Sequence, residues 1–476
     1  MMTSKEHELL RDFLDLMLNY LQENPLEENK VLNYQDYQSL EKALDTEIGQ
    51  QGVSEKALLL NIQSYLQNCV RTIHPQFFGK SYAAYSIPSL MGEILAAVTN
   101  TSMATYVGTP AATVIENALI QKMAQIVGFK QGDGIFLTGG TQANLTALLC
   151  ARNQFLPEAK KKGVNASNLA LFVSDQAHYS FISAVNVLGI GVNNLIRVQS
   201  DAQGRMDVQA LENAIELSIK AGKRPFFIGA TAGTTVLGAF DPIAQIAAIA
   251  AKYQLWLHID GAYCGSFLLS KRYKYLLQGC ELADSFSWDA HKLMGVPLPC
   301  SVILTKNKGV LYEGCTTGDI SKASSYVFHN LGEASCDLGE KSLQCTRKVD
   351  ALKLWLAFQY YGDLGYENRM NRLWELAQYA ADKINASSAL ELVYPRQSVN
   401  LCFRYRSQKT ANLNPFNRDL KERLIRQGNT FLNYSTVNGV GFLRMNILNP
   451  DIHETEIDYA LEQVTTVGLA LENDLY

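Results

Sequence analysis

Residues 255–260, Leu255-Trp256-Leu257-His258-Ile259-Asp260, form an almost wholly apolar run that ends in a carboxylate. The run has the length of a strand, and its apolar character predicts burial on both faces of a sheet. Three similar short runs occur earlier in the chain, at residues 134–138, 171–174 and 226–230. Residues 243–253 have a helical pattern, with Asp241 and Pro242 expected as N-cap and first-turn residue. Strands that alternate with helices predict an α/β domain with a mostly parallel sheet.

Polar side chains follow the predicted strands. Asp260 ends one strand, His178 follows residues 171–174, and Thr231 and Thr234 follow residues 226–230. Ligands of parallel sheets bind beyond the carboxyl ends of the strands, so we expect these side chains to line one site. An unpaired buried carboxylate at Asp260 would be costly, and a cationic ring nitrogen would satisfy it. His178 could stack on such a ring, although a lone histidine is more often structural.

A glycine-rich turn, Gly139-Gly140-Thr141-Gln142, lies between a predicted strand and a predicted helix at residues 143–154. Free N–H groups and the helix dipole at such a turn can hold a phosphate. A Gly-Gly pair alone is also typical of an ordinary tight turn. The sequence has no Walker lysine and no GxGxxG pattern here, which disfavours nucleotides.

Lys292 follows a short apolar run in the stretch Ser285-Phe286-Ser287-Trp288-Asp289-Ala290-His291-Lys292. A lysine at the end of a buried strand is costly unless it is used, and the obvious use is a Schiff base with an aldehyde cofactor. A surface lysine after an apolar strand is the alternative. A phosphate turn, an aromatic histidine, a carboxylate and a lysine, all at strand ends, together fit pyridoxal phosphate and require no metal.

The composition indicates a well-packed protein. Apolar residues make up 47% of the 476 residues and charged residues 18%, and the formal net charge is −4 without a basic cluster that would suggest nucleic acid. No apolar run approaches the roughly 18 residues of a membrane span. The N-terminus lacks the features of a secretory signal, and the nine cysteines show no CxxC spacing. We therefore expect a cytoplasmic protein without disulfides or a zinc site.

The chain divides into three expected parts. Residues 1–85 form a helical segment, whose apolar residues at i, i+3 and i+4 need a partner surface. Residues 86–365 form the large cofactor-binding domain. Residues 366–476 form a smaller α+β domain, with strands expected at 398–403 and 441–447.

Four motifs together resemble one family. They are Ser174-Asp175-Gln176-Ala177-His178-Tyr179-Ser180, Ala230-Thr231-Ala232-Gly233-Thr234-Thr235, His258-Ile259-Asp260-Gly261-Ala262 and Asp289-Ala290-His291-Lys292. Their order and composition resemble the group II pyridoxal-phosphate-dependent amino-acid decarboxylases. This family acts on substrates such as glutamate, aspartate, cysteine sulfinate, diaminobutyrate and aromatic amino acids.

The resemblance implies a fold-type-I enzyme that works as a homodimer, with sites at the subunit interface. It implies that Lys292 forms the Schiff base, that Asp260 pairs with the pyridine nitrogen, and that His178 stacks on the ring. The further cofactor residues that it implies are Gly140, Thr141, Gln142, Thr231, Thr234, Ala262 and His291. Arg444 resembles the family's arginine for the substrate carboxylate; without the resemblance, it could be a surface arginine on an edge strand.

The substrate stays open between two groups. Lys80, Ala104 with Thr105, and Pro299 stand near positions that tune the substrate in glutamate decarboxylases. Lys80 favours an acidic side chain and repels a cationic one. The stretches Lys341–Arg347 and Phe403–Arg406 are instead closer to diaminobutyrate and lysine decarboxylases.

Residues 328–337 lack the tyrosine that delivers the Cα proton in glutamate and cysteine-sulfinate decarboxylases. His329 or Tyr326 could donate instead. Otherwise decarboxylation could end in oxidation or transamination. Two further alternatives are an aminotransferase or carbon–sulfur lyase on the same fold, and a cofactor-binding protein that has lost catalysis.

Overall fold

The computed structural model describes residues 2–25, 28–164, 168–316, 327–328 and 336–475. The chain divides into two compact units. The first consists of Met1–Ala84, Leu376–Pro395 and Asn400–Tyr476, and the second of Tyr85–Glu375 and Arg396–Val399. The finer division into parts at residues 85 and 365 stays a prediction.

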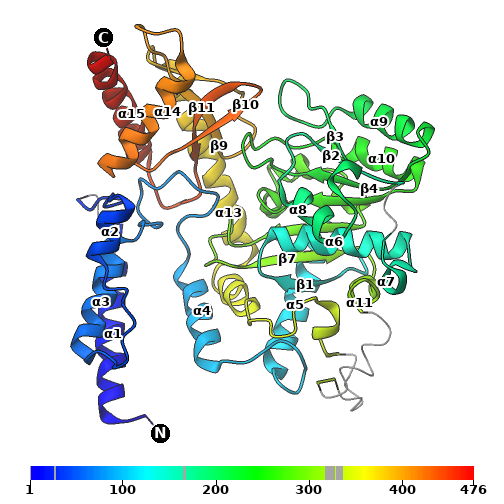
Figure 1. Cartoon of the computed structure of the whole chain (residues 1–476), viewed down its shortest axis with the longest axis horizontal. Helices are drawn as coiled ribbons and strands as arrows, with labels where there is room; N and C mark the ends of the chain where they lie inside the picture. The colour runs from blue at the N-terminus through cyan, green and yellow to red at the C-terminus, as the bar shows by residue number, and fades with distance from the viewer. Residues whose placement is uncertain (1, 26–27, 165–167, 317–326, 329–335, 476) are drawn as a thin grey trace. The chain divides into compact units, whose positions relative to one another are not determined.

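The second unit is built on a seven-stranded sheet with the order β1-β7-β6-β5-β4-β2-β3 (Figure 1). Its strands are β1 (Asp133–Leu137), β2 (Leu169–Ser174), β3 (Leu195–Val198), β4 (Arg224–Thr231), β5 (Trp256–Asp260), β6 (Ser285–Asp289) and β7 (Ser301–Thr305). Neighbours from β6 to β3 pair in parallel, whereas β7 is antiparallel to both β1 and β6. The predicted α/β fold with a mostly parallel sheet is confirmed.

Helices cover both faces of this sheet. The crossover through α8 (Ser180–Val187) leads toward one edge, whereas those through α9 (Val208–Lys220) and α10 (Ile243–Tyr253) lead toward the other. Right-handed crossovers in opposite directions put α8 on one face and α9 and α10 on the other. Helix α6 (Gly140–Phe155) packs against α8 and lies over β4 to β7. The other α-helices among the described residues 85–316 of this unit are α4 (Ile87–Thr99), α5 (Pro110–Val127), α7 (Ala159–Lys162) and α11 (Val310–Cys315).

Five strands of the sheet are buried along their whole length because helices exclude water from both faces. Every residue of β1, β2, β5, β6 and β7 is buried. This agrees with the almost wholly apolar sequences of β1, β2 and β7. The strand ends are therefore the points where polar side chains can reach a ligand.

The predicted N-cap of α10 is wrong. Pro242 occupies that position and provides no side-chain cap, while α10 begins at Ile243 as expected. The Asp241 carboxylate instead accepts from the backbone N–H groups of Met206 (2.6 Å) and Thr231 (2.7 Å). Burial raises the pKa of Asp241 to about 7. Asp241 thus ties the end of β4 to the loop before α9.

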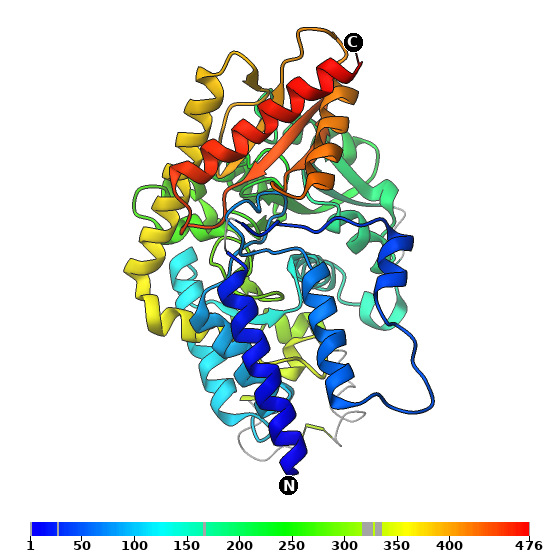
Figure 2. The same ribbon diagram turned by 90° about the vertical axis from the view of Figure 1, so that its left-hand side faces the viewer.

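The first unit combines N-terminal helices with a small sheet. Helices α1 (Ser4–Glu23) and α3 (Glu55–Asn68) contact each other, with α2 (Tyr37–Ala43) between them in sequence. The sheet order is β10-β11-β9-β8, from the strands β8 (Leu390–Leu392), β9 (Asn400–Tyr405), β10 (Asn433–Val437) and β11 (Val440–Asn446). Helices α14 (Leu413–Gln427) and α15 (Glu454–Leu475) pack side by side next to it (Figure 2). The α+β character expected for the C-terminal region is confirmed.

The N-terminal helices carry little buried surface of their own. None of the residues of α1, α2 or α3 is fully buried. Leu10, Leu14 and Leu18 of α1 are between 45% and 56% exposed. The homodimer that would cover such side chains stays a prediction. Among the helices in the described ranges, none is long and apolar enough to cross a membrane.

The two helices predicted near residues 350–361 and 373–384 lie within α13 (Ala351–Ala386), on either side of a kink. Gly362 interrupts this helix with φ 60° and ψ −170°. Glycine tolerates this left-handed conformation, so the break occurs where the sequence provides one.

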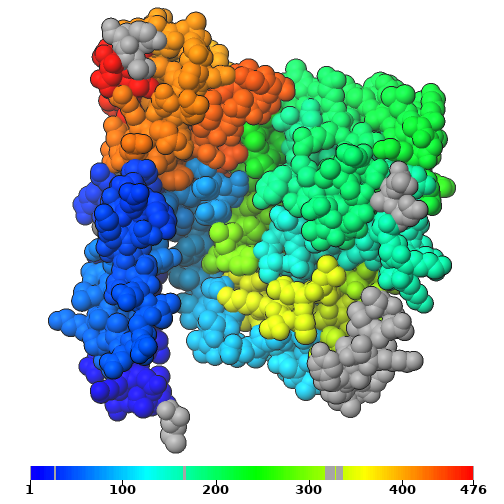
Figure 3. All heavy atoms as spheres, in the orientation of Figure 1, coloured from blue at the N-terminus to red at the C-terminus, as the bar shows by residue number. Residues whose placement is uncertain are grey.

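Gly428 joins the N-terminal segment to α14 within the first unit. It is the left-handed C-cap of α14 with φ 75°, and the Leu32 N–H donates to its carbonyl (3.3 Å). A Cβ atom at Gly428 would lie 1.9 Å from the carbonyl oxygen of Leu32. Figure 3 shows the blue N-terminal residues against the orange residues of this region. Only glycine allows both the positive φ and this close backbone approach.

We expect Gly428→Ala to destabilise the protein by about 3 kcal/mol, because left-handed strain and a backbone clash add. Gly439→Ala is the matched control, since Gly439 also has a positive φ (77°) but has nothing within 4 Å of its Cβ position. The control should cost only about 1 kcal/mol. The measurement is the midpoint of thermal unfolding. Equal losses in the two variants would contradict the importance of the Leu32 contact.

Candidate active site

Lys292 lies in the turn that follows β6. Its Nζ is 3.0 Å from Oδ2 of Asp289, the last residue of that strand, and its side chain is 21% exposed. Burial raises the pKa of Asp289, but the charges of Lys292 and His291 outweigh burial and hold that pKa below its usual value. The amine is therefore held by a buried carboxylate and remains open to a small molecule.

His291 packs on the same carboxylate. Its Nε2 lies 3.6 Å from Asp289 Oδ2, and its Nδ1 accepts from the backbone N–H of Cys300 (3.1 Å). Burial lowers the pKa of His291, and Asp289 opposes this effect. His291 and Lys292 thus meet at Asp289, although the sequence motif shows them only as chain neighbours.

Asp260 ends β5 next to this turn and is only 5% exposed. Its Oδ1 accepts from the N–H of Ala262 (3.1 Å) and from Oγ of Ser287 (3.2 Å). Its Oδ2 accepts from Nδ2 of Asn144 (2.8 Å). Three donors and no cationic side chain hold this carboxylate within the described residues, so a cationic ligand atom could still pair with it.

His178 and Thr231 lie near the same carboxylate. Thr231 of β4 is the register partner of Asp260, and its buried Oγ1 has no hydrogen-bond partner among the residues that the structure describes. Burial lowers the pKa of His178, while the charges of Asp260, Lys292 and Asp289 act on it in opposing directions. His178 therefore lies within electrostatic range of all three charged groups.

The N-terminus of α6 lies on another side of this candidate site. The helix begins at Gly140, three residues before the predicted start, so Thr141 and Gln142 belong to its first turn. Gly139 provides no side-chain cap, and the Gln142 side chain accepts from the Thr138 N–H (3.2 Å). A Cβ atom on Gly140 would lie 2.9 Å from Asp289 Oδ2 and 3.2 Å from Cβ of Ala262. The uncapped helix end therefore lies beside the Lys292 turn and Ala262.

These residues fit an aldehyde cofactor with a phosphate and a ring nitrogen. The partly exposed Lys292 amine suits the aldehyde. The uncapped N–H groups of α6 suit the phosphate, and the Asp260 carboxylate suits a protonated ring nitrogen. The unpartnered Thr231 hydroxyl leaves one more buried donor for the ligand. Thr234 has a different contact, since its Oγ1 accepts from the Ala239 N–H (3.1 Å).

The predicted substrate residues fall into two groups. Ala104 and Thr105 belong to the second unit, in a loop where the Ala104 carbonyl accepts from the Gly339 N–H (2.9 Å). No hydrogen bond or ion pair joins this loop to Lys292 in the described ranges. Pro299 also lies in the second unit, and its carbonyl accepts from Lys353 Nζ (2.5 Å).

Arg444 and Lys80 belong to the first unit, in segments that one hydrogen bond joins. Asn446, two residues after Arg444 on β11, donates from Nδ2 to the Lys80 carbonyl (3.0 Å). Arg444 is 6% exposed, and β11 pairs with strands on both sides. The alternative of an edge-strand surface arginine is therefore wrong. Tyr326 and His329, the expected alternative proton donors, lie outside the described residues.

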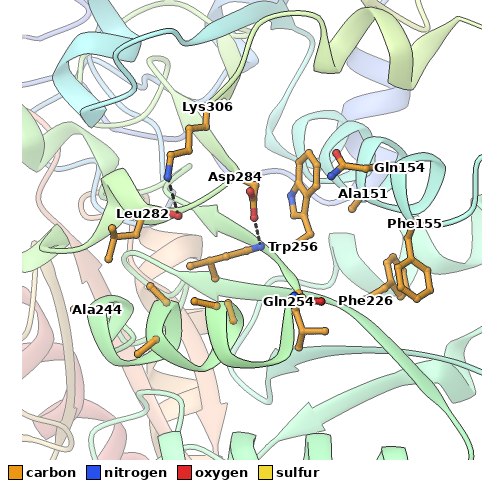
Figure 4. A pocket seen from close by; sticks show the side chains of 16 residues that line it. Ala151, Gln154, Phe155, Phe226, Ala244, Gln254, Trp256, Leu282, Asp284 and Lys306 are labelled. Carbon is orange, nitrogen blue, oxygen red and sulfur yellow. Dashed lines mark hydrogen bonds between the residues drawn. The ribbon is translucent and has the colours of Figure 1, made fainter.

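A separate cavity of about 680 Å³ lies at the amino ends of β4, β5 and β6 (Figure 4). It is lined by residues such as Phe226, Trp256, Asp284 and Lys306, and by none of the predicted site residues. The described part of the chain also holds no cluster of three or more histidine, cysteine, aspartate or glutamate side chains that could bind a metal ion. The candidate cofactor residues lie instead at the opposite, carboxyl ends of the strands, where ligands of parallel sheets bind.

The sequence reasoning missed several polar residues that surround the predicted ones. Asp289, Asn144, Ser287 and His258 were not recognised as parts of the site. A signal was present, because 258 and 260 on β5 and 285, 287 and 289 on β6 are polar residues at alternate positions of buried strands. Period-two polarity in a buried strand indicates that one face holds a polar cluster.

Comparisons with known proteins agree with this geometry. A family model described as the pyridoxal-dependent decarboxylase conserved domain matches residues 38–406. The Bos taurus protein named Acidic amino acid decarboxylase GADL1 is 35% identical over 453 residues, which cover 92% of this chain and 86% of the relative. The crystal structure of mouse CSAD in apo form has a TM-score of 0.93 at 33% identity, covering 97% of this chain and 98% of that chain.

The fold extends to more distant proteins. The crystal structure of Oryza sativa TDC with PLP and tryptamine has a TM-score of 0.90 at 24% identity, covering 99% of both chains. This chain belongs to the pyridoxal-dependent decarboxylase family. It is a pyridoxal-phosphate-dependent amino-acid decarboxylase, a lyase. The predicted family, fold class, cofactor and enzyme class are confirmed.

We expect Gly140→Ala to weaken pyridoxal phosphate binding by about tenfold or more, because the new methyl group must displace Asp289 or the first turn of α6. The measurement is a titration of the apoenzyme with pyridoxal phosphate, followed by visible absorbance. Gly52→Ala is the control, since nothing lies within 4 Å of its Cβ position. Unchanged affinity in Gly140→Ala would argue against a phosphate at this helix end.

Proposed function

We propose that Lys292 holds pyridoxal phosphate through a Schiff base at Nζ, and that the enzyme decarboxylates an acidic amino acid. The observation that carries this proposal is the Lys292–Asp289 contact of 3.0 Å at the carboxyl end of β6. A buried carboxylate that holds a partly exposed amine orients it for attack on a carbonyl carbon.

The other site residues bind and orient the cofactor. Asp260 keeps a proton on the ring nitrogen, and His178 stacks on the ring. The N–H groups at Gly140 and Thr141 hold the phosphate together with the Gln142 side chain, and His291 and Asp289 bound that side. When bound, pyridoxal phosphate is the electron sink for the electrons that remain on Cα when carbon dioxide leaves. Asp260 supports this role because its charge stabilises the protonated ring.

The substrate assignment rests on charge and on the relatives. GADL1 is named as an acidic amino acid decarboxylase and is 35% identical to this chain. Two cationic residues, Arg444 and Lys80, belong to segments of the first unit that Asn446 links through a hydrogen bond to the Lys80 carbonyl. We assign Arg444 to the α-carboxylate and Lys80 to the side-chain carboxylate of the substrate.

The features that resemble diamino-acid decarboxylases have other contacts. Arg347 forms a buried ion pair with Glu116 (2.8 Å), and Lys341 pairs with Asp133 (2.9 Å). In the first unit Arg404 pairs with Glu391 (2.5 Å). These intramolecular pairs explain why the side chains are present without a cationic substrate, so the acidic substrate is favoured.

We expect Lys292→Ala to abolish the visible absorbance of the bound cofactor and to lower decarboxylation by several orders of magnitude, because the covalent link is lost. Lys306→Ala is the matched control, since Lys306 also follows a strand of the sheet and its Nζ donates to the Leu282 carbonyl (3.4 Å), away from the candidate site. The measurements are the absorbance spectrum and carbon dioxide release. Retained turnover in Lys292→Ala would contradict the assignment of Lys292 as the Schiff-base lysine.

The substrate is tested with a panel of glutamate, aspartate, cysteine sulfinate, diaminobutyrate, lysine and DOPA, with products identified by mass spectrometry. We expect amines from the acidic members, and Lys80→Gln should lower their kcat/KM by about tenfold through the loss of one charge-assisted hydrogen bond. Its effect on DOPA should be small. If Lys80→Gln turned over diaminobutyrate faster and turned over none of the acidic substrates, a diamino acid would be the favoured substrate. An aldehyde product would indicate oxidation or transamination after carbon dioxide loss.

A further inference from the structure

A chain of buried hydrogen bonds connects the interior of the second unit to Asp260. Trp256 and His258 lie two residues apart on β5, and Asp260 follows two residues later, so the three side chains share one face of the strand. Ser285 on β6 and Asn144 on α6 face them. The links are Trp256 Nε1 to Ser285 Oγ (2.9 Å), Ser285 Oγ to His258 Nδ1 (2.8 Å), His258 Nε2 to Asn144 Oδ1 (2.9 Å) and Asn144 Nδ2 to Asp260 Oδ2 (2.8 Å).

The chemistry of these groups fixes the direction of the chain. The Asn144 amide must turn its NH₂ group toward Asp260, because its oxygen would repel the carboxylate. The Asn144 oxygen then accepts from His258, so the His258 proton is on Nε2. The Nδ1 atom of His258 must then accept a hydrogen bond, so the Ser285 hydroxyl donates to it. The Ser285 oxygen accepts in turn from the Trp256 indole N–H, which can only donate. Every donor in the chain therefore points toward Asp260.

Burial keeps the chain in this one arrangement. His258 and Ser285 are 0% exposed and Asn144 is 1% exposed. Burial lowers the pKa of His258 to about 4, although the charge of Asp260 acts in the opposite sense. His258 is therefore neutral at pH 7 and carries its single proton on Nε2. Aligned donors in a buried chain polarise one another and strengthen the last bond, which goes to the carboxylate.

Ser287 adds a further donor to Asp260. The Ser287 Oγ lies 3.2 Å from Asp260 Oδ1 and 3.1 Å from Asn144 Oδ1, but its hydroxyl has only one hydrogen. The charged Asp260 oxygen is the stronger acceptor, so this hydrogen goes to Asp260. Asn144 and Ser287 therefore donate to the two different oxygens of the Asp260 carboxylate.

We propose that Asn144 and His258 are positioning residues that hold the Asp260 carboxylate ionised and oriented toward the ring nitrogen of the cofactor. The proposal rests on the proposed pairing of Asp260 with that nitrogen. Neither residue touches the reacting atoms. They act through Asp260. The chain of hydrogen bonds begins at Trp256, whose side chain lines the cavity at the amino ends of the strands (Figure 4).

The test uses holoenzyme loaded with pyridoxal phosphate carrying nitrogen-15 in its ring, because the NMR shift of that atom reports its protonation directly. We expect His258→Phe, which keeps the ring volume and removes both hydrogen bonds, to lower the protonated fraction of the ring nitrogen at neutral pH. The kcat should fall by about tenfold to a hundredfold, with a smaller change in KM. His258→Gln, whose amide can donate to Asn144, should restore most of both signals.

Ser285→Ala provides a gentler variant that is less prone to misfolding. It removes the donor to His258 Nδ1 and should give a change of the same sign but smaller size. Ser266→Ala is the matched control, since Ser266 is also fully buried and accepts from a tryptophan indole, Trp288, at 2.9 Å, without joining the chain to Asp260. Its ring-nitrogen signal and kcat should equal those of the unmodified enzyme.

Asp260→Asn separates failure of this proposal from failure of the proposed function. If Asp260→Asn leaves the ring-nitrogen signal unchanged, Asp260 does not pair with the ring and the proposed role of that residue fails. If Asp260→Asn changes the signal but His258→Phe and Ser285→Ala do not, the positioning role alone is overturned. An equal effect of Ser285→Ala and Ser266→Ala would assign the change to lost packing and would also overturn it.

Discussion

Asp260 and Asp289 end neighbouring strands of the sheet, and both carboxylates are almost fully buried. Two buried anions close to each other are tolerated only if each has its own donors or counter-charges. Asp289 has Lys292 at 3.0 Å and His291 at 3.6 Å. Asp260 has three neutral donors, of which Asn144 is the nearest. This difference in partners gives the two carboxylates different roles: one orients an amine, and the other can accept a cationic ring atom.

The sheet provides the rigidity that this arrangement needs. Parallel strands bring their carboxyl ends to one edge, and complete burial of β5 and β6 leaves those ends little freedom. Helix α6 adds its uncapped N-terminus at the same edge, where Gly140 packs against Asp289 and Ala262 too closely for a side chain. A phosphate at that helix end and a ring nitrogen at Asp260 would define two fixed points for one cofactor, with Lys292 as the third.

Several elements could be predicted from the sequence because the local pattern determined them. The strand that ends at Asp260 and the helix from Ile243 to Tyr253 are apolar runs with clear ends, and both were predicted within one residue. The strands β3 and β7 were not predicted. β7 is antiparallel within a largely parallel region, so the alternation of strands and helices did not indicate it. Asp241 was wrongly assigned as an N-cap, because two backbone N–H groups from distant segments bind its carboxylate instead.

The sequence by itself determined the family, the cofactor and the main candidate residues, because motifs such as Asp289-Ala290-His291-Lys292 combine chemically rare residues at fixed spacing. Only the tertiary structure decided how these residues are supported. Asn144 lies 116 positions before Asp260, and His258 and Ser285 belong to different strands, so no local pattern could join them. Hydrogen bonds between side chains depend on distances of about 3 Å and on direction, and these are set by the packing of α6 on the sheet rather than by order along the chain.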